Sequence, residues 1–209
     1  MHGNSGVANY WFYLLANGGS GTNDLGNAFS VSSITREVAA KIAYRALVYH
    51  FTPNTNYAQA RQFTILAAED LYGQCSNEAL QVAKAWYAVG VGTNPVNTIT
   101  GPTSVCPYQT NVNFAATANV GSTYTWTLPP NTSVVSGSGT NSITINFNGT
   151  TPGARTISVN EFTSDVCVPV AKSITVLDAV ANAATCNAYP KPLSPNGLSF
   201  DGTDDVAVI

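Results

Sequence analysis

The character of the sequence changes sharply near residue 93, and this change limits the folds that the chain can adopt. Before it, apolar residues recur at the three- and four-residue spacing of amphipathic helices. After it, short runs rich in Thr, Val, Ile and Asn alternate with the period of two that strands have. The sequence therefore predicts a multidomain chain: an all-α helical bundle over residues 1–92, then an all-β immunoglobulin-like sandwich over residues 98–178.

Four helices are expected in the first part, and their connections are short enough for an antiparallel bundle. The first, from Ser5 to Ala16, is apolar on nearly all sides, so it should be buried within a protein body. Part of the surface that buries it should lie outside this chain, which predicts an exposed apolar patch on the helical unit. Residues 18–33, rich in Gly, Ser and Asn, are expected to form a loop. The expected buried faces are Val38, Ile42, Ala46 and Tyr49; Ala60, Thr64, Ala67, Ala68 and Leu71; and Ala79, Val82, Ala83, Trp86 and Val89.

Seven short strands separated by turn residues are expected between residues 98 and 178. Their number and length match an immunoglobulin-like sandwich. Trp126, in the alternating run Tyr124-x-Trp126-x-Leu128, is predicted to be the central core residue. Residues 179–197, rich in Ala, Asn and Pro, are expected to be a linker.

The four cysteines form no Cys-x-x-Cys pair, which argues against zinc-ribbon and thiol-redox motifs. Cys106 and Cys167 fall near the start and the last strands of the expected sandwich. We therefore expect a disulfide between them, with two packed free thiols as the alternative. Cys75 and Cys186 belong to different units and receive no predicted partner.

Charged residues make up only 9% of the chain, and the net charge is −3. No basic cluster indicates a nucleic-acid partner. No apolar run is long enough to span a membrane, and no signal peptide is expected within the chain. An even number of cysteines in a Thr- and Asn-rich chain favours an oxidising, extracellular location, with any export signal lying upstream.

Residues 2–92 carry a series of motifs in one order: His2-x-Asn4-Ser5-Gly6-Val7-x-Asn9, Ala43-Tyr44-Arg45-Ala46-Leu47, Thr52-Pro53, Asn56-Tyr57, Asp70-Leu71-Tyr72-Gly73 and Ala88-Val89-Gly90-Val91. In this order and spacing the segment resembles the C-terminal helical part of thermolysin-like zinc metalloendopeptidases. The resemblance implies a secreted protease that acts on proteins or peptides and uses zinc-activated water.

In that family a histidine before the first of these helices donates a hydrogen bond to the oxyanion of the tetrahedral intermediate. His2 is the matching residue, and the resemblance makes it the candidate catalytic residue. Such a donor is valuable because negative charge develops on the carbonyl oxygen during the attack of water.

The chain departs from the family in one important respect. It contains two histidines, His2 and His50, and no His-Glu-x-x-His motif. It therefore cannot supply three zinc ligands or the general base. We expect no metal ligand in this chain and no activity from it alone. His50, near the end of the second helix, is expected to be structural.

Residues 98–178 resemble PKD-like modules of secreted bacterial enzymes, through Gly101-Pro102, Val105-Cys106, Tyr124-Thr125-Trp126, Gly139–Ile145 and Cys167 before Ile174-Thr175-Val176. Residues 198–209, which begin Leu198-Ser199-Phe200-Asp201-Gly202, resemble the start of a laminin-G-like domain.

Two questions stay open from the sequence. Asp201, Asp204 and Asp205 could bind calcium, but a solvated acidic turn is the favoured interpretation because the ligands are too few. The function itself has an alternative: a non-catalytic adhesion protein whose β modules bind a polysaccharide or cell-surface partner.

Overall fold

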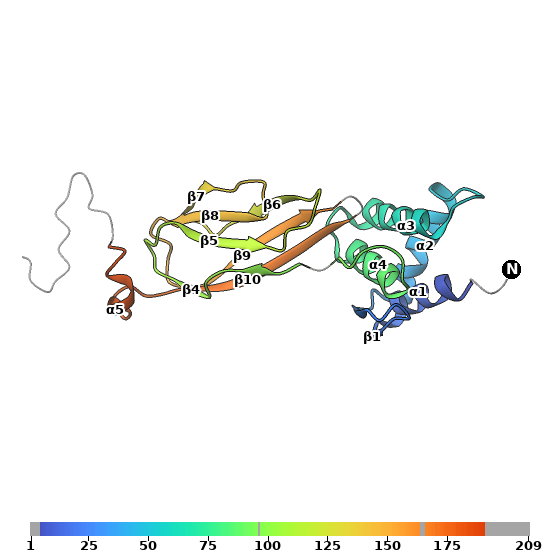
Figure 1. The fold of residues 1–209 in the computed structure, drawn as a ribbon, viewed down its shortest axis with the longest axis horizontal. Coiled ribbons are helices and arrows are strands. Elements are labelled where there is room, and N and C mark those ends of the chain that lie inside the picture. Colours follow the sequence, from blue (N-terminus) through green and yellow to red (C-terminus); the bar gives the residue numbers. More distant parts are fainter. Residues whose placement is uncertain (1–4, 96, 164–165, 191–209) are drawn as a thin grey trace, which may run out of the picture.

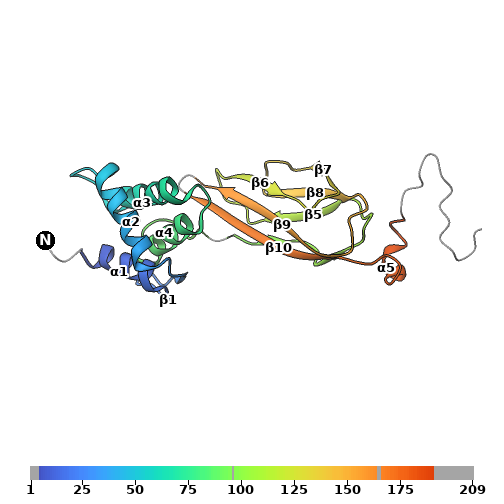
Figure 2. The same cartoon turned by 180° about the vertical axis from the view of Figure 1, so that it is seen from behind.

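The computed structural model describes residues 5–95, 97–163 and 166–190. Within them the chain is elongated, with a helical unit at one end, two stacked sheets in the middle and a short C-terminal helix at the other end (Figures 1 and 2). The order of helices first and strands second is as predicted. The helices α1 and α5 thus lie at opposite ends of the described chain.

Four helices form the helical unit: α1 (Ser5–Asn17), α2 (Arg36–Tyr49), α3 (Tyr57–Tyr72) and α4 (Asn77–Ala88). Each coincides with a predicted helix. Side chains cap free N–H groups at the starts of α2, α3 and α4. Asn56 and Gln59 form a reciprocal capping box on α3, and Ser76 accepts from the N–H of Ala79 at the start of α4.

A β-hairpin corrects the expectation of an all-α bundle. Strands β1 (Gly19–Thr22) and β2 (Ala28–Val31) pair antiparallel within the stretch expected to be a loop. The Asn23 side-chain oxygen accepts from the N–H groups of Leu25 and Asn27 and so closes the turn. The hairpin escaped prediction because β1 reads Gly-Ser-Gly-Thr, which has neither alternation nor strand propensity.

The core of the helical unit gathers around Trp86, whose ring stacks on Trp11 at a centroid distance of 5.0 Å. The indole N–H of Trp86 donates to Thr64 Oγ1 (2.7 Å). Most positions predicted to be buried are buried, but Tyr49 and Leu71 are 65% and 43% exposed. The described residues enclose α1 only in part, and its remaining side chains face outward. Only Trp11, Leu14 and Leu15 of α1 are buried.

The sandwich has two four-stranded sheets, in the orders β4-β10-β9-β6 and β3-β5-β8-β7. This arrangement is the immunoglobulin-like one that the sequence predicted. The described residues hold eight strands in place of the expected seven, because the first strand splits at Gly101-Pro102 and its two parts join different sheets. The strands are β3 (Ile99–Thr100), β4 (Ser104–Val105), β5 (Val112–Ala116), β6 (Thr123–Thr127), β7 (Thr132–Ser136), β8 (Ser142–Phe147), β9 (Gly153–Phe162) and β10 (Cys167–Val176).

Phe114 and Phe147 occupy the centre of the sandwich, where at most 1% of each side chain is exposed. Trp126 was expected there, but it is only partly buried at the edge of the core. Its indole N–H donates to the Thr140 carbonyl (2.8 Å), which holds the ring near the surface. A Trp that can satisfy its polar atom at a loop need not enter the core.

The predicted Cys106–Cys167 disulfide is wrong, although both residues are in disulfides. Cys75 pairs with Cys167, and Cys106 pairs with Cys186. The register explains why: Val105 lies opposite Val176, so Cys106 sits beside the end of β10, whereas Cys167 begins that strand. At about 3.3 Å per residue, a ten-residue strand places the two cysteines roughly 30 Å apart, far beyond disulfide reach.

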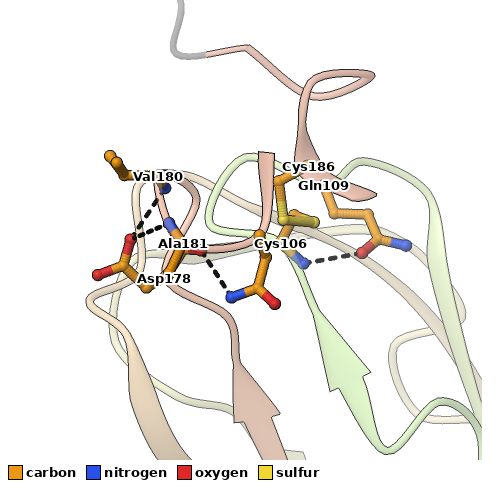
Figure 3. The surroundings of a disulfide bond; sticks show 7 residues. Cys106, Gln109, Asp178, Val180, Ala181 and Cys186 are labelled. Carbon is orange, nitrogen blue, oxygen red and sulfur yellow. Dashed lines mark hydrogen bonds between the residues drawn. A yellow bond between two sulfur atoms is a disulfide. The ribbon is translucent and has the colours of Figure 1, made fainter. Parts of the chain in front are cut away.

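The segment expected to be a linker contains a short helix, α5 (Ala183–Cys186), beyond the end of the sandwich. Figure 3 shows how this helix is attached: Cys186 bonds to Cys106, and the Asp178 carboxylate accepts from the N–H groups of Val180 and Ala181. The segment expected to begin a laminin-G-like domain, 198–209, lies outside the described residues.

Candidate functional site

His2, the predicted catalytic residue, lies outside the described residues, so its role stays a prediction. The structure does describe the helix that follows it. α1 begins at Ser5, and no residue in its first turn is acidic. In the sequence, position 2 precedes the first residue of this helix by three positions.

A groove lies beside this end of α1. Gly6, Val7 and Tyr10 form one wall, and Ala88, Val89 and Gly90 at the end of α4 contribute to it. The β-hairpin supplies the other wall through Ser20–Leu25 and Phe29. The groove has a volume of about 660 Å³ and mixes apolar side chains with backbone and small polar groups. It could hold several residues of an extended chain or the side chains of a packed partner.

The second histidine is part of a small polar cluster on the surface formed by α2 and α3. Arg45 donates to Asp70 Oδ2 through Nε and Nη2 (3.1 and 3.0 Å), and His50 Nε2 lies 3.1 Å from the same oxygen. The Arg45 guanidinium also lies 4.0 Å from the centre of the Tyr49 ring. Hydrogen bonding by Arg45 lowers the pKa of the Asp70 carboxyl below its ordinary value.

The carboxyl next to it behaves in the opposite way. Burial, together with the negative charge of Asp70, raises the pKa of Glu69. Sequence analysis gave His50 a structural role, and the contacts agree, because the cluster joins the end of α2 to the end of α3. The cluster itself was not predicted, since its members are 20 to 25 residues apart on different helices.

No group of three His, Cys, Asp or Glu side chains within the described ranges could hold a metal ion. These described residues therefore offer no cluster with the donors of a zinc site, and the expectation that the chain supplies no metal ligand stays a prediction. The three aspartates weighed as calcium ligands, Asp201, Asp204 and Asp205, lie outside the described residues. Across the described helices, none combines the length and apolarity needed to cross a bilayer.

A buried arginine was missed by sequence analysis. Arg61 is 3% exposed and lies on the same face of α3 as Thr64 and Ala68. Its position at the helical spacing from these buried residues was the available signal. It donates to main-chain carbonyls of Ala83 and of the segment that leaves the helical unit.

Both parts of the chain match known family models. Residues 1–91 match the alpha-helical domain of thermolysin metallopeptidase, and residues 93–176 match a PKD-like domain. The predicted resemblances of these two parts are thereby confirmed, whereas nothing supports the laminin-G-like one.

Individual relatives agree with the first match. Thermolysin from Alicyclobacillus acidocaldarius subsp. acidocaldarius and bacillolysin from Bacillus caldolyticus are each 45% identical over 91 residues, which cover 44% of this chain and 16% of the relative. A transglutaminase-activating metalloprotease from Streptomyces mobaraensis is 34% identical over 140 residues, covering 60% of this chain and 18% of the relative. The chain thus spans less than a fifth of these relatives.

Among solved structures, a complex of the pro- and mature domains of RgpB from Porphyromonas gingivalis covers 71% of this chain and 36% of its own. The TM-score is 0.26 and the identity 14%, so this likeness carries no argument about fold or function.

Proposed function

We propose that this chain is a C-terminal part of a secreted, zinc-dependent metalloendopeptidase with an accessory β-sandwich. The observation that carries the proposal is the match of residues 1–91, at up to 45% identity, to the helical domain of thermolysin-like enzymes. It favours the peptidase over the adhesion protein, because the helical unit would be only a spacer in an adhesion protein.

The exposed surface of the helical unit supports the same proposal. Tyr10 and Tyr13 of α1 are 46% and 54% exposed, and Tyr44 and Leu47 of α2 are 68% and 64% exposed. Large apolar side chains on neighbouring helices are typical of a surface that packs against another protein part. In the proposed enzyme, that part is the half that holds zinc.

Within this arrangement the chemical contribution of the chain is one hydrogen-bond donor. The imidazole of His2 donates to the oxygen that becomes negatively charged when the peptide carbonyl is attacked. The metal and the general base belong to residues outside this chain. The substrate is a protein or peptide, and the chain is inactive by itself.

The disulfides support an extracellular location. All four cysteines are paired, and disulfides persist in oxidising compartments. The low charge and the Thr- and Asn-rich sequence fit the same location.

The test replaces each of the two histidines in the longer polypeptide that carries the zinc-binding half. His2→Ala should lower the turnover number by roughly 10²–10³-fold, because a positioned oxyanion donor has that effect in comparable sites. Zinc content should not change. His50→Gln is the matched control, since the His50 side chain lies beside Asp70 and Phe63 of α3, and its turnover should equal that of the parent. An unchanged turnover in His2→Ala would remove His2 from the mechanism.

A further inference from the structure

The helical unit and the sandwich are joined at two places that are far apart in the sequence. The main chain crosses between them at residues 93–97. The Cys75–Cys167 disulfide forms a second crossing, with a sequence separation of 92 residues. Cys75 lies in the turn between α3 and α4, and Cys167 is the first residue of β10. Both views show the start of β10 beside the helices (Figures 1 and 2).

Apolar contacts surround the disulfide crossing. Val166 and Val168, on either side of Cys167, are 5% and 2% exposed. They belong to the same core cluster as Trp86 and the buried residues of α1 to α4. The end of the sandwich therefore contributes side chains to the core of the helical unit.

Arg61 fixes the main-chain crossing from the helical side. Its guanidinium donates to the carbonyls of Val91 (3.3 Å) and Thr93 (3.4 Å) as well as Ala83 (2.6 Å). Gly92 has a φ of +81°, and a Cβ on it would lie 2.5 Å from Arg61 Nε. The absence of a side chain at Gly92 thus allows the guanidinium to lie against the linker backbone.

Asn97 fixes the same crossing from the sandwich side. Its amide nitrogen donates to the buried carboxylate of Glu161 (2.5 Å), and its oxygen accepts from the N–H of Thr117 (2.8 Å). Asn119 donates to the other carboxylate oxygen of Glu161 (2.7 Å). The linker is therefore hydrogen-bonded at both ends.

The two disulfides differ in their access to solvent. Cys106 and Cys186 are 1% and 3% exposed, and Cys167 is 2% exposed, whereas Cys75 is only half-buried. The Cys75–Cys167 bond is therefore the more accessible of the two. Because a thiolate must reach a sulfur atom to exchange with it, this bond should be reduced first.

We propose that the sandwich is a rigid arm of the helical unit and that the Cys75–Cys167 disulfide is a reducible clasp that makes the two units one cooperative body. A small dithiol opens the clasp by exchange. Two electrons and two protons pass to the cysteines, which become thiols, while the dithiol is oxidised to its own disulfide. The Cys106–Cys186 disulfide fastens α5 to the far end of the sandwich. With the Cys75–Cys167 disulfide closed, the position of α5 relative to the helical unit is therefore also fixed. This inference does not depend on the peptidase function.

The first experiment compares two double variants of the full chain by calorimetry. The oxidised parent should unfold in one transition. Cys75→Ser with Cys167→Ser should split it into two, with a fall in Tm of about 5–15 °C for the less stable unit, as expected for a loss of a long-range cross-link. Cys106→Ser with Cys186→Ser is the matched control and should keep a single transition. A single transition in the first variant, or an equal split in the control, would overturn the clasp.

The second experiment needs no substitution, so it stays decisive if a variant fails to fold. The folded chain is treated with increasing dithiothreitol, alkylated and analysed by mass spectrometry. Cys75 and Cys167 should be alkylated before Cys106 and Cys186. At that stage, proteolysis between residues 91 and 97 should be at least about tenfold faster than in the oxidised chain. The reason is that the linker can then open without unfolding of either unit. Alkylation of Cys106 and Cys186 first, or an unchanged proteolysis rate, would contradict the proposal.

Discussion

The helical unit and the sandwich differ in how completely they bury their large apolar side chains. The sandwich encloses Phe114 and Phe147 between its sheets, and its exposed large apolar residues are valines in a loop and on the edge strand β7. The helical unit encloses Trp86 but leaves large side chains of α1 and α2 in solvent; these are Tyr10, Tyr13, Tyr44, Leu47, Val48 and Tyr49. The sandwich thus leaves few large apolar side chains in solvent, whereas the helical unit leaves several on neighbouring helices.

The largest expected effect comes from emptying either core. Trp86→Ala removes the ring that stacks on Trp11 and the hydrogen bond to Thr64, and Phe114→Ala removes a fully buried ring from the sandwich. Each should lower the free energy of unfolding by about 3–5 kcal/mol. Denaturant unfolding of each variant measures this loss.

The same two substitutions can be tested in a chain that lacks the Cys75–Cys167 disulfide, where the two units should unfold separately. Trp86→Ala should then lower only the transition of the helical unit, and Phe114→Ala only that of the sandwich. If either variant moved both transitions equally, the two units would not have separate cores.

The smallest expected effect concerns the cluster at the ends of α2 and α3. The pKa of Asp70 is lowered in the fold, chiefly by the hydrogen bond from Arg45, so the charged carboxylate stabilises the folded state. That contribution is fully present above the ordinary carboxyl pKa of about 4 and is lost as the pH falls through the lower folded value. Asp70→Asn should therefore cost about 0.5 kcal/mol at pH 7, since the side chain is 37% exposed, and progressively less in acid.

Glu69→Gln is the control for this prediction. The pKa of Glu69 is raised by burial and by Asp70, so its charge opposes folding at neutral pH. Removing that charge should not lower stability at pH 7. A loss in Glu69→Gln as large as that in Asp70→Asn would show that the carboxylates do not act as described.

Sequence periodicity was sufficient for the four long helices and for the strands with clear alternation. The repeat of Ala79, Val82, Ala83 and Trp86 placed α4 and its buried face, and the alternation of Val112, Phe114 and Ala116 placed β5 and its inner face. In both cases local pattern and tertiary burial agree, so no knowledge of neighbouring elements was needed.

The errors arise where a residue's role is set by elements far away in the sequence. The partners of Cys106 and Cys167 depend on which end of β10 each one meets, and this follows from strand register and from the placement of α3 and α4. Arg61 is buried because the linker carbonyls come to it from 30 or more residues away. The exposure of Tyr13, in contrast with the burial of Leu14, depends on what covers α1.

The central claim is that the helical unit is one half of a peptidase cleft and holds no zinc site of its own. The most direct measurement is zinc titration calorimetry of the 209-residue chain, followed by a peptide hydrolysis assay on the same sample and on the longer polypeptide that carries the other half. The account predicts no tight zinc binding and no hydrolysis by the chain alone, with both present in the longer polypeptide. Tight zinc binding together with peptide cleavage by the chain alone would contradict it.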